Sequence, residues 1–369
     1  MNSIKTKLIF QKKFLISIIL FSLVLVVCTG CKEKAPEKVV QTKSAIGTIC
    51  TITLYEQNAE SLFDEIFAAL DLLEQHVSVN IATSDIAKIN DAAGTNNPIT
   101  VNDDTLYILQ AAIKYASLTG GAFDPSIGPL VKLWAIGTDK EHVPSQAQID
   151  SAKALVDYTK IQLDPEKKTV YLPVKGMSLD LGGIAKGYAA DMIVQILQQH
   201  GVSKAIIDLG GNIYAYGAKA PATNTTDAIP WKVGIKNPFD STGAPIIVAS
   251  LINKTVVTSG VYERFFIKDG VRYHHLIDRK TGYPEQNGLM SATIITNSSM
   301  MADALSTAVF ILGKEKGIAL LEKLNTESKD SEGVLYDVQG LCVDKDKNIT
   351  ATSNLRLKIA VIDSSFSLE

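Results

Sequence analysis

Two short segments carry side chains whose types and spacing suit chemistry on phosphate groups. Residues 178–191 read SLDLGGIAKGYAAD, in which a strand is expected to end at Asp180, to break at Gly182 and Gly183, and to restart as a helix near Lys186. A glycine-rich turn lets a ligand approach the backbone closely, and the free N–H groups that open a helix attract anions. This turn therefore predicts a phosphate site.

The second segment, MADALST at residues 301–307, is expected to be helical. Asp303 and Thr307 are four residues apart, so they lie on one face of that helix. A carboxylate and a hydroxyl that point the same way are hard oxygen ligands suited to Mg²⁺. A phosphate site and a magnesium site together predict chemistry on a diphosphate.

Each of these segments also has a simpler explanation. Most GGxxxG turns only pack a helix on a strand, and the segment matches neither the GxxxxGK[ST] loop nor the GxGxxG dinucleotide pattern. Asp303 could complement a helix N-terminus, and Thr307 could bond back within its own helix. Neither segment identifies the function alone.

Two further segments have features of a ligand site. GGAFD at residues 120–124 offers a backbone-rich ledge for a planar ring, or it is simply the turn that closes a helix. TSGVYERFF at residues 258–266 holds the charged pair Glu263–Arg264, which is typical of a salt bridge at a strand edge.

YHHLIDRKTGYP at residues 273–284 holds two of the five histidines. His274 and His275 are adjacent in an expected strand and point to opposite faces, so at most one of them faces a given site. A histidine followed by an acid three residues later, as His275 is by Asp278, is structural more often than catalytic.

Residues 1–30 have the pattern of a lipoprotein signal peptide. A lysine-rich start precedes the apolar run Phe14–Val27, which is too short for a comfortable transmembrane span. Small residues before Cys31 resemble a lipobox, so Cys31 is expected to carry the lipid that holds the protein to the cell membrane on its extracytoplasmic side. Ordinary signal cleavage and an uncleaved anchor are the alternatives.

Residues 31–44 are charged and are expected to be a flexible tether, followed by one folded domain at residues 45–362.

The composition limits the classes of partner. The formal net charge of −3 over 369 residues gives no electrostatic footprint for nucleic acid, so no nucleic-acid partner is expected. After export, Cys50 and Cys342 remain. Two buried thiols in strands are favoured, and a disulfide between them stays open.

Helical and strand patterns are mixed without regular alternation, which favours an α+β fold. Helices are expected at residues 59–77, 104–119, 299–312 and 314–324, and a capping box at Ser145 and Gln148 opens a further short helix. Residues 218–229 are expected to be a surface excursion. Strands are expected at residues 46–55, 204–209, 213–217, 231–235, 246–252, 255–258, 272–277, 291–296, 334–338 and 357–362.

All these segments occur in the order found in the ApbE family, the FAD:protein FMN transferases, which the chain resembles over residues 44–362. The resemblance rests on GAFD, DLGGIAKGYAAD, DLGGN, SGVYERFF, HLIDRKTGYP and ADALST taken together. It implies an α+β fold with an FAD cleft between two subdomains. It also implies that FMN passes from FAD to a threonine hydroxyl of a partner protein, leaving AMP.

The resemblance also implies roles for particular residues. Asp303 and Thr307 would hold Mg²⁺ by their side chains, with the Gly183 carbonyl as a further ligand and Ser306 close by. His275 would be the general base. Contacts with FAD would come from Val77, Asn80, Ala122, Phe123, Asp124, Asp180, Lys186 and Ile277.

The chain departs from the family pattern at two positions. Arg279 stands where proline is usual, which is expected to be a tolerated change in a turn. Asn80 stands where an aromatic ring is common, and an amide there could admit water to the nucleotide. Magnesium-dependent hydrolysis of FAD to FMN and AMP is therefore an alternative to transfer, and a non-catalytic FAD-binding lipoprotein is a third reading. The expected acceptors are exported or membrane subunits of flavin-dependent electron transport.

Overall fold

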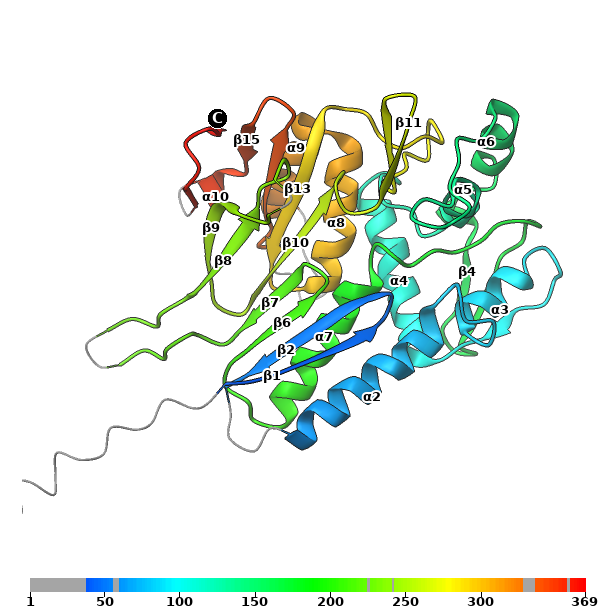
Figure 1. Ribbon diagram of the computed structural model, residues 1–369. Helices are drawn as coiled ribbons and strands as arrows, with labels where there is room; N and C mark the ends of the chain where they lie inside the picture. Colours follow the sequence, from blue (N-terminus) through cyan, green and yellow to red (C-terminus); the bar gives the residue numbers. More distant parts are fainter. Residues whose placement is uncertain (1–37, 56–59, 224–225, 241, 328–335, 357–358) are drawn as a thin grey trace, which may run out of the picture. The chain divides into compact units, whose positions relative to one another are not determined.

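The computed structural model describes residues 38–55, 60–223, 226–240, 242–327, 336–356 and 359–369 (Figure 1). The expected signal peptide, Cys31 and the first part of the expected tether lie outside these residues. Residues 38–369 form one compact unit, into which the two expected subdomains are packed together. Helices and strands are mixed, so the predicted α+β class is confirmed.

A nine-stranded sheet forms the centre of the fold, and every neighbouring pair is antiparallel except the last, β15 and β17. The alternation of buried and more exposed residues explains why these segments form strands. In β2, Cys50, Ile52 and Leu54 are buried while the residues between them are partly exposed. The strands, in spatial order, are β1 (Val39–Ala45), β2 (Thr48–Leu54), β6 (Ala205–Leu209), β7 (Asn212–Tyr216), β10 (Lys254–Gly260), β13 (Leu289–Thr296), β14 (Gln339–Asp344), β15 (Asn348–Ala351) and β17 (Ser367–Leu368).

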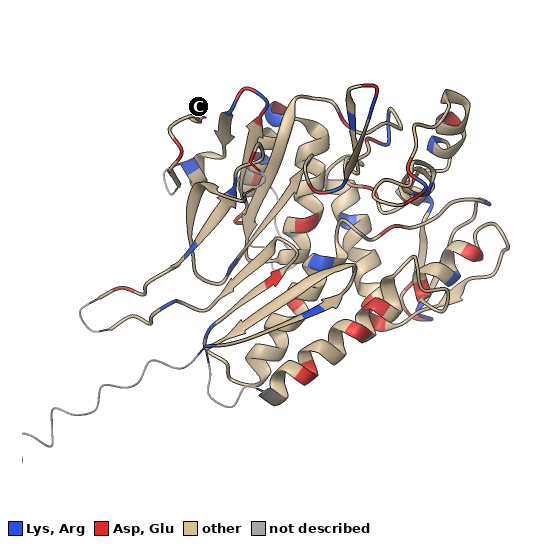
Figure 2. Ribbon diagram, in the orientation of Figure 1, with Lys and Arg blue, Asp and Glu red and all other residues tan. Residues whose placement is uncertain are grey.

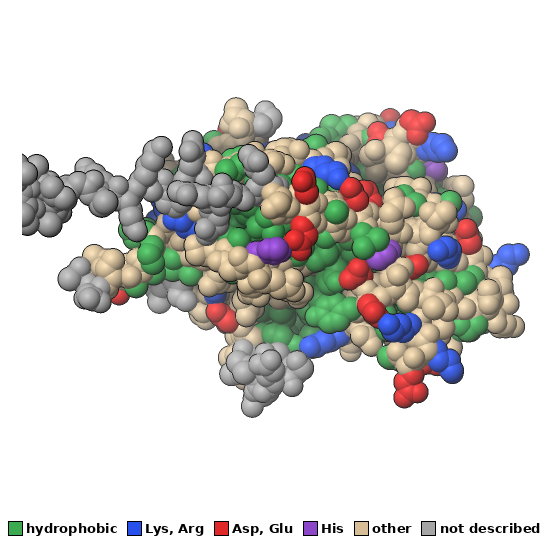
Figure 3. Space-filling model, turned by 90° about the horizontal axis from the view of Figure 1, so that it is seen from below, with side chains coloured by type: hydrophobic (Ala, Val, Ile, Leu, Met, Phe, Trp, Pro, Cys, Tyr) green, Lys and Arg blue, Asp and Glu red, His purple; other side chains and the backbone are tan. Residues whose placement is uncertain are grey.

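Helices cover one face of this sheet (Figure 1). The longest, α2, buries Ile66, Leu70 and Leu73, which recur at helical spacing. Several of its acidic residues, coloured red in Figure 2, are exposed. The principal helices are α2 (Glu60–Val77), α4 (Asp103–Leu118), α7 (Ala185–Gln199), α8 (Ser299–Leu312) and α9 (Lys314–Glu327). The shorter helices are α3 (Asp85–Asp91), α5 (Gly128–Trp134), α6 (Gln146–Lys153), α10 (Ser353–Arg356) and the 3₁₀ turn η1 (Tyr158–Lys160). On the face seen from below in Figure 3, acidic and basic side chains are interspersed among polar and apolar ones.

The other face of the sheet is covered by a three-stranded sheet in the order β16-β9-β8. Neighbouring residues of one strand point to opposite faces. Accordingly, Val257 packs into the core beneath the helices, whereas Val256 packs with Trp231 and Ile235 of β8. The remaining strands are β8 (Trp231–Lys236), β9 (Pro245–Leu251), β16 (Ala360–Val361), the hairpin β11 (Phe265–Lys268) with β12 (Val271–His274), and β3 (Ile99–Thr100), β4 (Gln162–Asp164) and β5 (Thr169–Tyr171).

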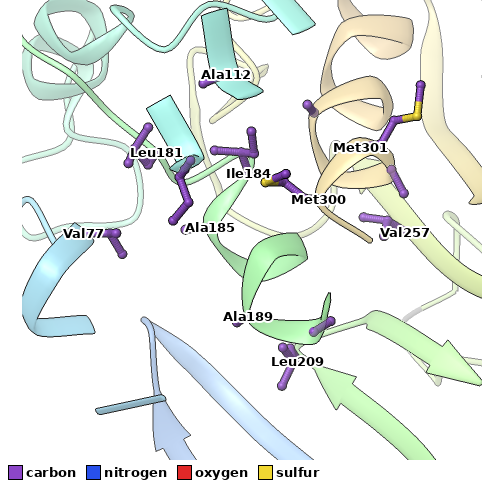
Figure 4. Close-up of a cluster of buried hydrophobic side chains, with 14 of the residues drawn as sticks. Val77, Ala112, Leu181, Ile184, Ala185, Ala189, Leu209, Val257, Met300 and Met301 are labelled. Carbon is purple, nitrogen blue, oxygen red and sulfur yellow. The ribbon is translucent and has the colours of Figure 1, made fainter. Parts of the chain in front are cut away.

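The core beneath the glycine turn fixes the start of α7. Leu181 and Ile184, just before this helix, are buried, and in Figure 4 they lie near Ala112 of α4 and Met300 of α8. A Cβ built on Gly187 would lie 2.3 Å from the carbonyl oxygen of Ser299. Only glycine therefore allows α7 to approach the first turn of α8 this closely.

The strand expected to end at Asp180 does not form. Residues 178–181 make only an isolated bridge, between Ile127 and Ser178. The side chain of Asn90 replaces a neighbouring strand, because its Oδ1 accepts from the N–H of Leu179 (2.6 Å) and its Nδ2 donates to the carbonyl of Leu179 (3.0 Å). Apolar and polar residues alternate in this segment because it is a loop that is buried on one side.

Several expected boundaries also differ. Residues 39–44, assigned to the tether, belong to β1, an edge strand in which the exposed residues Val40, Thr42 and Ser44 alternate with half-buried ones. The folded unit extends past residue 362, because β17 pairs with β15. The strand expected at 272–277 ends at His274. Of the strand expected at 357–362, residues 357–358 lie outside the described residues, and β16 spans Ala360–Val361. Of the strand expected at 334–338, the first two positions lie outside the described residues, and β14 begins only at Gln339.

Other expectations are confirmed. The capping box of Ser145 and Gln148 opens α6. Cys50 and Cys342 are free and buried. None of the helices within the described part of the chain is long and apolar enough to cross a membrane.

Candidate active site

A cleft of about 860 Å³ opens beside the glycine turn, a size typical of ligand pockets. Its lining brings together segments far apart in the sequence, from the end of α2 to the middle of α8. The predicted site residues that line it are Val77, Asn80, Ala122, Phe123, Asp124, Asp180, Gly183, Lys186, His275, Ile277, Asp303 and Thr307.

Ser306, expected close to the metal, lies outside this lining. Its side chain is fully buried, its Oγ donates to the carbonyl of Asp303 (2.9 Å), and it shares a hydrogen bond with Ser259 Oγ (2.9 Å). On a helix, the residue before Thr307 is rotated away from the face that Thr307 shares with Asp303. Ser306 therefore supports the helix behind the site.

The predicted metal ligands are neighbours. Asp303 is 4% exposed, and its Oδ2 accepts from the N–H of Gly187 (3.0 Å), which fixes the carboxylate. A Cβ built on Gly183 would lie 3.3 Å from Thr307 Oγ1, so the backbone of Gly183 runs beside that hydroxyl. All the donors are oxygens, as Mg²⁺ prefers, and a single carboxylate leaves positions for water and substrate phosphate.

This donor set differs from that of a structural metal site. Among the described residues, no three His, Cys, Asp or Glu side chains form a group that could hold a metal. Mg²⁺ sites of phosphate chemistry commonly use one or two carboxylates and complete the shell with substrate phosphates. The residues present thus fit Mg²⁺ held together with a diphosphate.

The helix start offers fewer N–H groups than the sequence suggested. The N–H of Ile184 and that of Ala185 donate to the carbonyl of Leu181 (3.0 and 2.9 Å), and the N–H of Gly187 donates to Asp303. The positive charge near the turn comes instead from Lys186, whose Nζ lies 3.0 Å from the Gly182 carbonyl and 3.5 Å from Asp303 Oδ1.

Arg279 does more than replace a proline in a turn. Its guanidinium lines the cleft and pairs with Asp124 Oδ2, while Asp124 Oδ1 accepts from the N–H (2.8 Å) and hydroxyl (2.6 Å) of Ser126. The carboxylate predicted to contact FAD is thus already bound by protein donors. The remaining N–H groups of Arg279 are available at this end of the cleft.

The two adjacent histidines face different environments, as expected from strand alternation. His275 lines the cleft. Its Nδ1 lies 3.3 Å from the Arg264 carbonyl, which can only accept, so Nδ1 carries the proton and Nε2 keeps its lone pair. Burial, with the nearby charge of Arg264, lowers the pKa of His275 to about 3, so its imidazole is neutral at pH 7.

His274 faces the interior. It is 2% exposed, packs edge-on against Phe310, and has Nε2 2.8 Å from the Glu285 carbonyl. Its Nδ1 accepts from the N–H of Leu276 (3.3 Å), so a proton on Nδ1 would face another donor. Burial lowers the pKa of His274 to about 4.

This burial predicts acid sensitivity. Between pH 6.5 and about 4 the unfolded chain binds a proton at His274 and the folded chain does not, so the free energy of unfolding falls as the pH falls. Across that window the loss is about 3 kcal/mol. His274→Gln keeps a donor and an acceptor but does not titrate, and its stability should depend less on pH. Denaturant unfolding of parent and variant at pH 7 and 4.5 measures the difference, and equal pH dependence would contradict the prediction.

Sequence reasoning missed two groups of residues. Asp191 of α7 accepts from Ser298 Oγ (3.0 Å) and from the N–H groups of Ser299 (2.7 Å) and Met300 (3.0 Å). These hydrogen bonds fix the start of α8 and therefore the position of Asp303, which follows on the same helix. Asp191 is the last residue of SLDLGGIAKGYAAD, so its place in that segment could have identified it as a candidate. The second group lies at the end of β8 and after β10. Gly234, Ile235 and Lys236 come from a segment without a motif of its own, whereas Tyr262 and Glu263 belong to the SGVYERFF segment but were given no role in the site.

A separate cavity of about 630 Å³ lies beside α7 and holds none of the predicted site residues. Asp191 lines it together with several tyrosines. Burial raises the pKa of Asp191 to about 6, against the lowering effect of its three donors. The chemistry of the predicted motifs therefore belongs to the larger cleft.

Comparison with known proteins agrees with this site. The chain is 38% identical to the FAD:protein FMN transferase of Treponema pallidum, over 88% of this chain and 89% of that protein. It is 36% identical to an enzyme of the same name from Klebsiella pneumoniae, over 88% and 94% of the two chains. Among solved structures, the ApbE protein of Thermotoga maritima matches with a TM-score of 0.75 and 31% identity, over 87% of this chain and 99% of that one. The ApbE family model matches residues 46–329, and the chain belongs to the ApbE family.

Proposed function

We propose that the protein transfers FMN from FAD to a threonine hydroxyl of an acceptor protein, with Mg²⁺ held by Asp303, Thr307 and the Gly183 carbonyl. One observation carries the proposal: these oxygen donors, Lys186 and the free Nε2 of His275 line a single cleft large enough for a ligand. Transfer of FMN from FAD to protein is the activity named for the relatives in Treponema and Klebsiella.

The reaction balances without a further reactant. The threonine oxygen attacks the flavin-side phosphorus of FAD, a phosphoester bond forms, and the bond to the AMP oxygen breaks. His275 Nε2 takes the threonine proton, and the proton later passes to solvent or to the AMP phosphate. Such a displacement needs in-line placement and neutralisation of phosphate charge more than covalent chemistry from the protein.

The chain's own residues supply that environment. Bound Mg²⁺ would neutralise charge on the diphosphate and on the leaving AMP. Lys186 adds a fixed positive charge beside Asp303. Phe123 and Trp134, which are almost wholly buried, line the cleft and exclude water from it. The anionic diphosphate would favour protonation of His275 and so oppose the effect of burial.

The test is to incubate the chain with FAD, MgCl₂ and a purified, flavin-free subunit of an exported electron-transport flavoprotein. Protein-bound FMN is then separated from free FMN and AMP. We expect one AMP for each FMN bound to the acceptor. No labelled acceptor, with FAD consumed only to free FMN and AMP, would exclude transfer and leave hydrolysis.

Hydrolysis remains the second candidate because of Asn80. This residue is exposed, follows the end of α2, and lines the cleft, and its N–H donates to Ser78 Oγ (3.2 Å). An amide at this edge leaves a path for water that a ring would close. A purely FAD-binding role is less favoured, because binding alone needs neither the metal ligands nor a free imidazole.

Asn80→Tyr is expected to tighten FAD binding and to reduce acceptor-independent release of AMP relative to transfer. A ring stacked on a base contributes roughly 1–3 kcal/mol in nucleic-acid sites, and a similar gain is expected here. The measurements are FAD affinity by fluorescence and AMP release with and without acceptor, and Asn80→Ala is the control for loss of the amide alone. Equal affinity and equal hydrolysis in parent and Asn80→Tyr would remove the reason for the second candidate.

We also propose that the protein acts outside the cytoplasm, attached to the membrane through lipidated Cys31, on subunits of flavin-dependent electron transport. The support is the lysine-rich start, the short apolar run and the small residues before Cys31. Mass spectrometry of the N-terminal peptide tests it. An unmodified Cys31 in membrane-bound protein would contradict it.

A further inference from the structure

The predicted FAD and metal residues account for only part of the cleft. Another part of its lining, which we call the β8 rim, consists of Gly234, Ile235 and Lys236 at the end of β8 together with Tyr262 and Glu263 after β10. None of these five residues was predicted to bind FAD or Mg²⁺. The rim is one continuous surface, because Lys236 Nζ lies 5.2 Å from the centre of the Tyr262 ring.

The end of β8 presents its backbone to the cleft. Successive side chains of a strand point to opposite faces, yet three consecutive residues, 234 to 236, all line the cleft. Gly234 has no side chain, and the side chain of Ile235 is 2% exposed and packs into the core between the two sheets. These three residues therefore line the cleft with the backbone at the edge of β8.

That edge has no neighbouring strand. In the order β16-β9-β8, β8 pairs with β9 on one side, and no other described strand pairs with it. The N–H of Asn237 donates to Ala244 on the β9 side (2.9 Å), and hydrogen-bonding direction alternates along an antiparallel strand. The N–H and C=O groups of Lys236 and Gly234 therefore point to the open side, where another extended chain can pair with them.

The β8 rim leads directly to the reacting groups. Glu263 lines the same cleft as Lys236 of the rim and as Lys186 and Asp303 of the predicted metal site, and its carboxyl is near enough to all three to interact electrostatically with them. Arg264 follows Glu263, and its carbonyl is the partner of His275 Nδ1. A chain paired with β8 would thus continue toward His275 Nε2, the proposed acceptor of the threonine proton.

We propose that the acceptor protein binds by adding an extended segment to the open edge of β8, with its threonine hydroxyl directed at His275. This inference rests on the proposed transfer to threonine and identifies how that acceptor is held. Strand addition obtains affinity from main-chain hydrogen bonds, so acceptors of different sequence can be used provided the segment around the threonine is extended.

Charge on the rim favours the same occupant. Lys236 stacks on Tyr262, and Arg264, which follows the rim residue Glu263, also lines the cleft. Within the described part of the chain, neither cation has a carboxylate at ion-pair distance. These two cations outnumber the single carboxylate of Glu263. The rim therefore accepts a neutral or acidic segment more readily than a basic one.

Lys236→Pro tests the proposal, because proline removes the N–H that points to the open side and places a ring on the edge while leaving pairing with β9 intact. The matched control is Lys232→Pro, four residues earlier on the same alternation but outside the cleft lining. Lys236→Ala separates loss of the ammonium from loss of the N–H. The probe is the flavin-free subunit used to establish transfer.

We expect kcat/KM for the acceptor to fall at least about tenfold in Lys236→Pro, the equivalent of one or two strand hydrogen bonds, with FAD affinity unchanged. Lys232→Pro should transfer at the parent's rate. Hydrogen exchange of the Gly234 and Lys236 amides in the parent should slow when a Thr→Val variant of the acceptor binds. Unimpaired transfer by Lys236→Pro, or no slowing of these amides, overturns the inference while the proposed function stands. A parent that labels no acceptor removes both.

Discussion

Asp303→Ala is expected to lower the rate of FMN transfer by at least about 100-fold, because Mg²⁺ stabilisation of a phosphoryl transition state is worth several kcal/mol. The carboxylate is nearly buried and is held by the N–H of Gly187 beside Thr307 and Gly183. Asp303 is the one carboxylate among the predicted metal ligands. The measurement is transfer to the acceptor as a function of MgCl₂ concentration.

Asp303→Asn is the more informative partner of that variant. Alanine leaves the buried N–H of Gly187 without an acceptor, which costs about 1–3 kcal/mol of stability and complicates the comparison. Asparagine keeps an acceptor oxygen for Gly187 and removes only the charge. Equal loss of transfer in both variants, with normal unfolding of Asp303→Asn, assigns the effect to metal binding. Full activity in Asp303→Asn, or of the parent in excess EDTA, would contradict it.

The side-by-side placement of the predicted metal ligands could be foreseen because it depends on local spacing. Asp303 and Thr307 share a helix face by spacing alone, and α8 forms at the expected residues 299–312. The glycine turn was recognisable for the same reason. Its detailed chemistry was not, since the N–H groups that open α7 are taken up by Leu181 and Asp303, contacts that depend on how α7 meets α8.

The errors arise where a distant side chain decides the outcome. Apolar alternation before Asp180 is the same for a strand and for a loop buried on one side. The contacts of this loop come from distant residues, among them Asn90, which is 89 positions from Leu179. Arg279 was expected to be a tolerated change in a turn, at a position where proline is usual in the family. Its partner, Asp124, is 155 positions away, so no local pattern shows the pair.

The β8 rim is a functional surface that local sequence patterns likewise do not reveal. Gly234, Ile235 and Lys236 carry no motif, and the segment that holds Tyr262 and Glu263 indicated only a salt bridge at a strand edge. They become a surface only because the small sheet packs on the main sheet with the end of β8 at the cleft. Motifs gave the groups predicted to meet FAD and metal, whereas the part of the cleft proposed for the protein acceptor depends on how the two sheets pack.

His275→Ala is expected to lower FMN transfer by about 10²–10⁴-fold, the usual effect of losing a general base, while FAD affinity stays within about tenfold. The reason is the tautomer: the Arg264 carbonyl holds the proton on Nδ1, so Nε2 is the free base in the cleft. His275→Gln is the matched control, since its amide can retain a hydrogen bond but cannot accept a proton at neutral pH. Both variants should be equally impaired.

The pH profile distinguishes a base from a residue that only supports the hairpin. Because burial lowers the pKa of His275 from 6.5 to about 3, the imidazole stays unprotonated well below neutrality in the free enzyme. The acid limb of kcat/KM for FAD, which reports groups of the free enzyme, should therefore lie well below pH 6.5. In the ternary complex the diphosphate opposes the effect of burial, so the acid limb of kcat should lie at higher pH than that of kcat/KM. If His274→Gln loses transfer and His275→Ala does not, the catalytic base lies on the other face of this strand and the assignment is wrong.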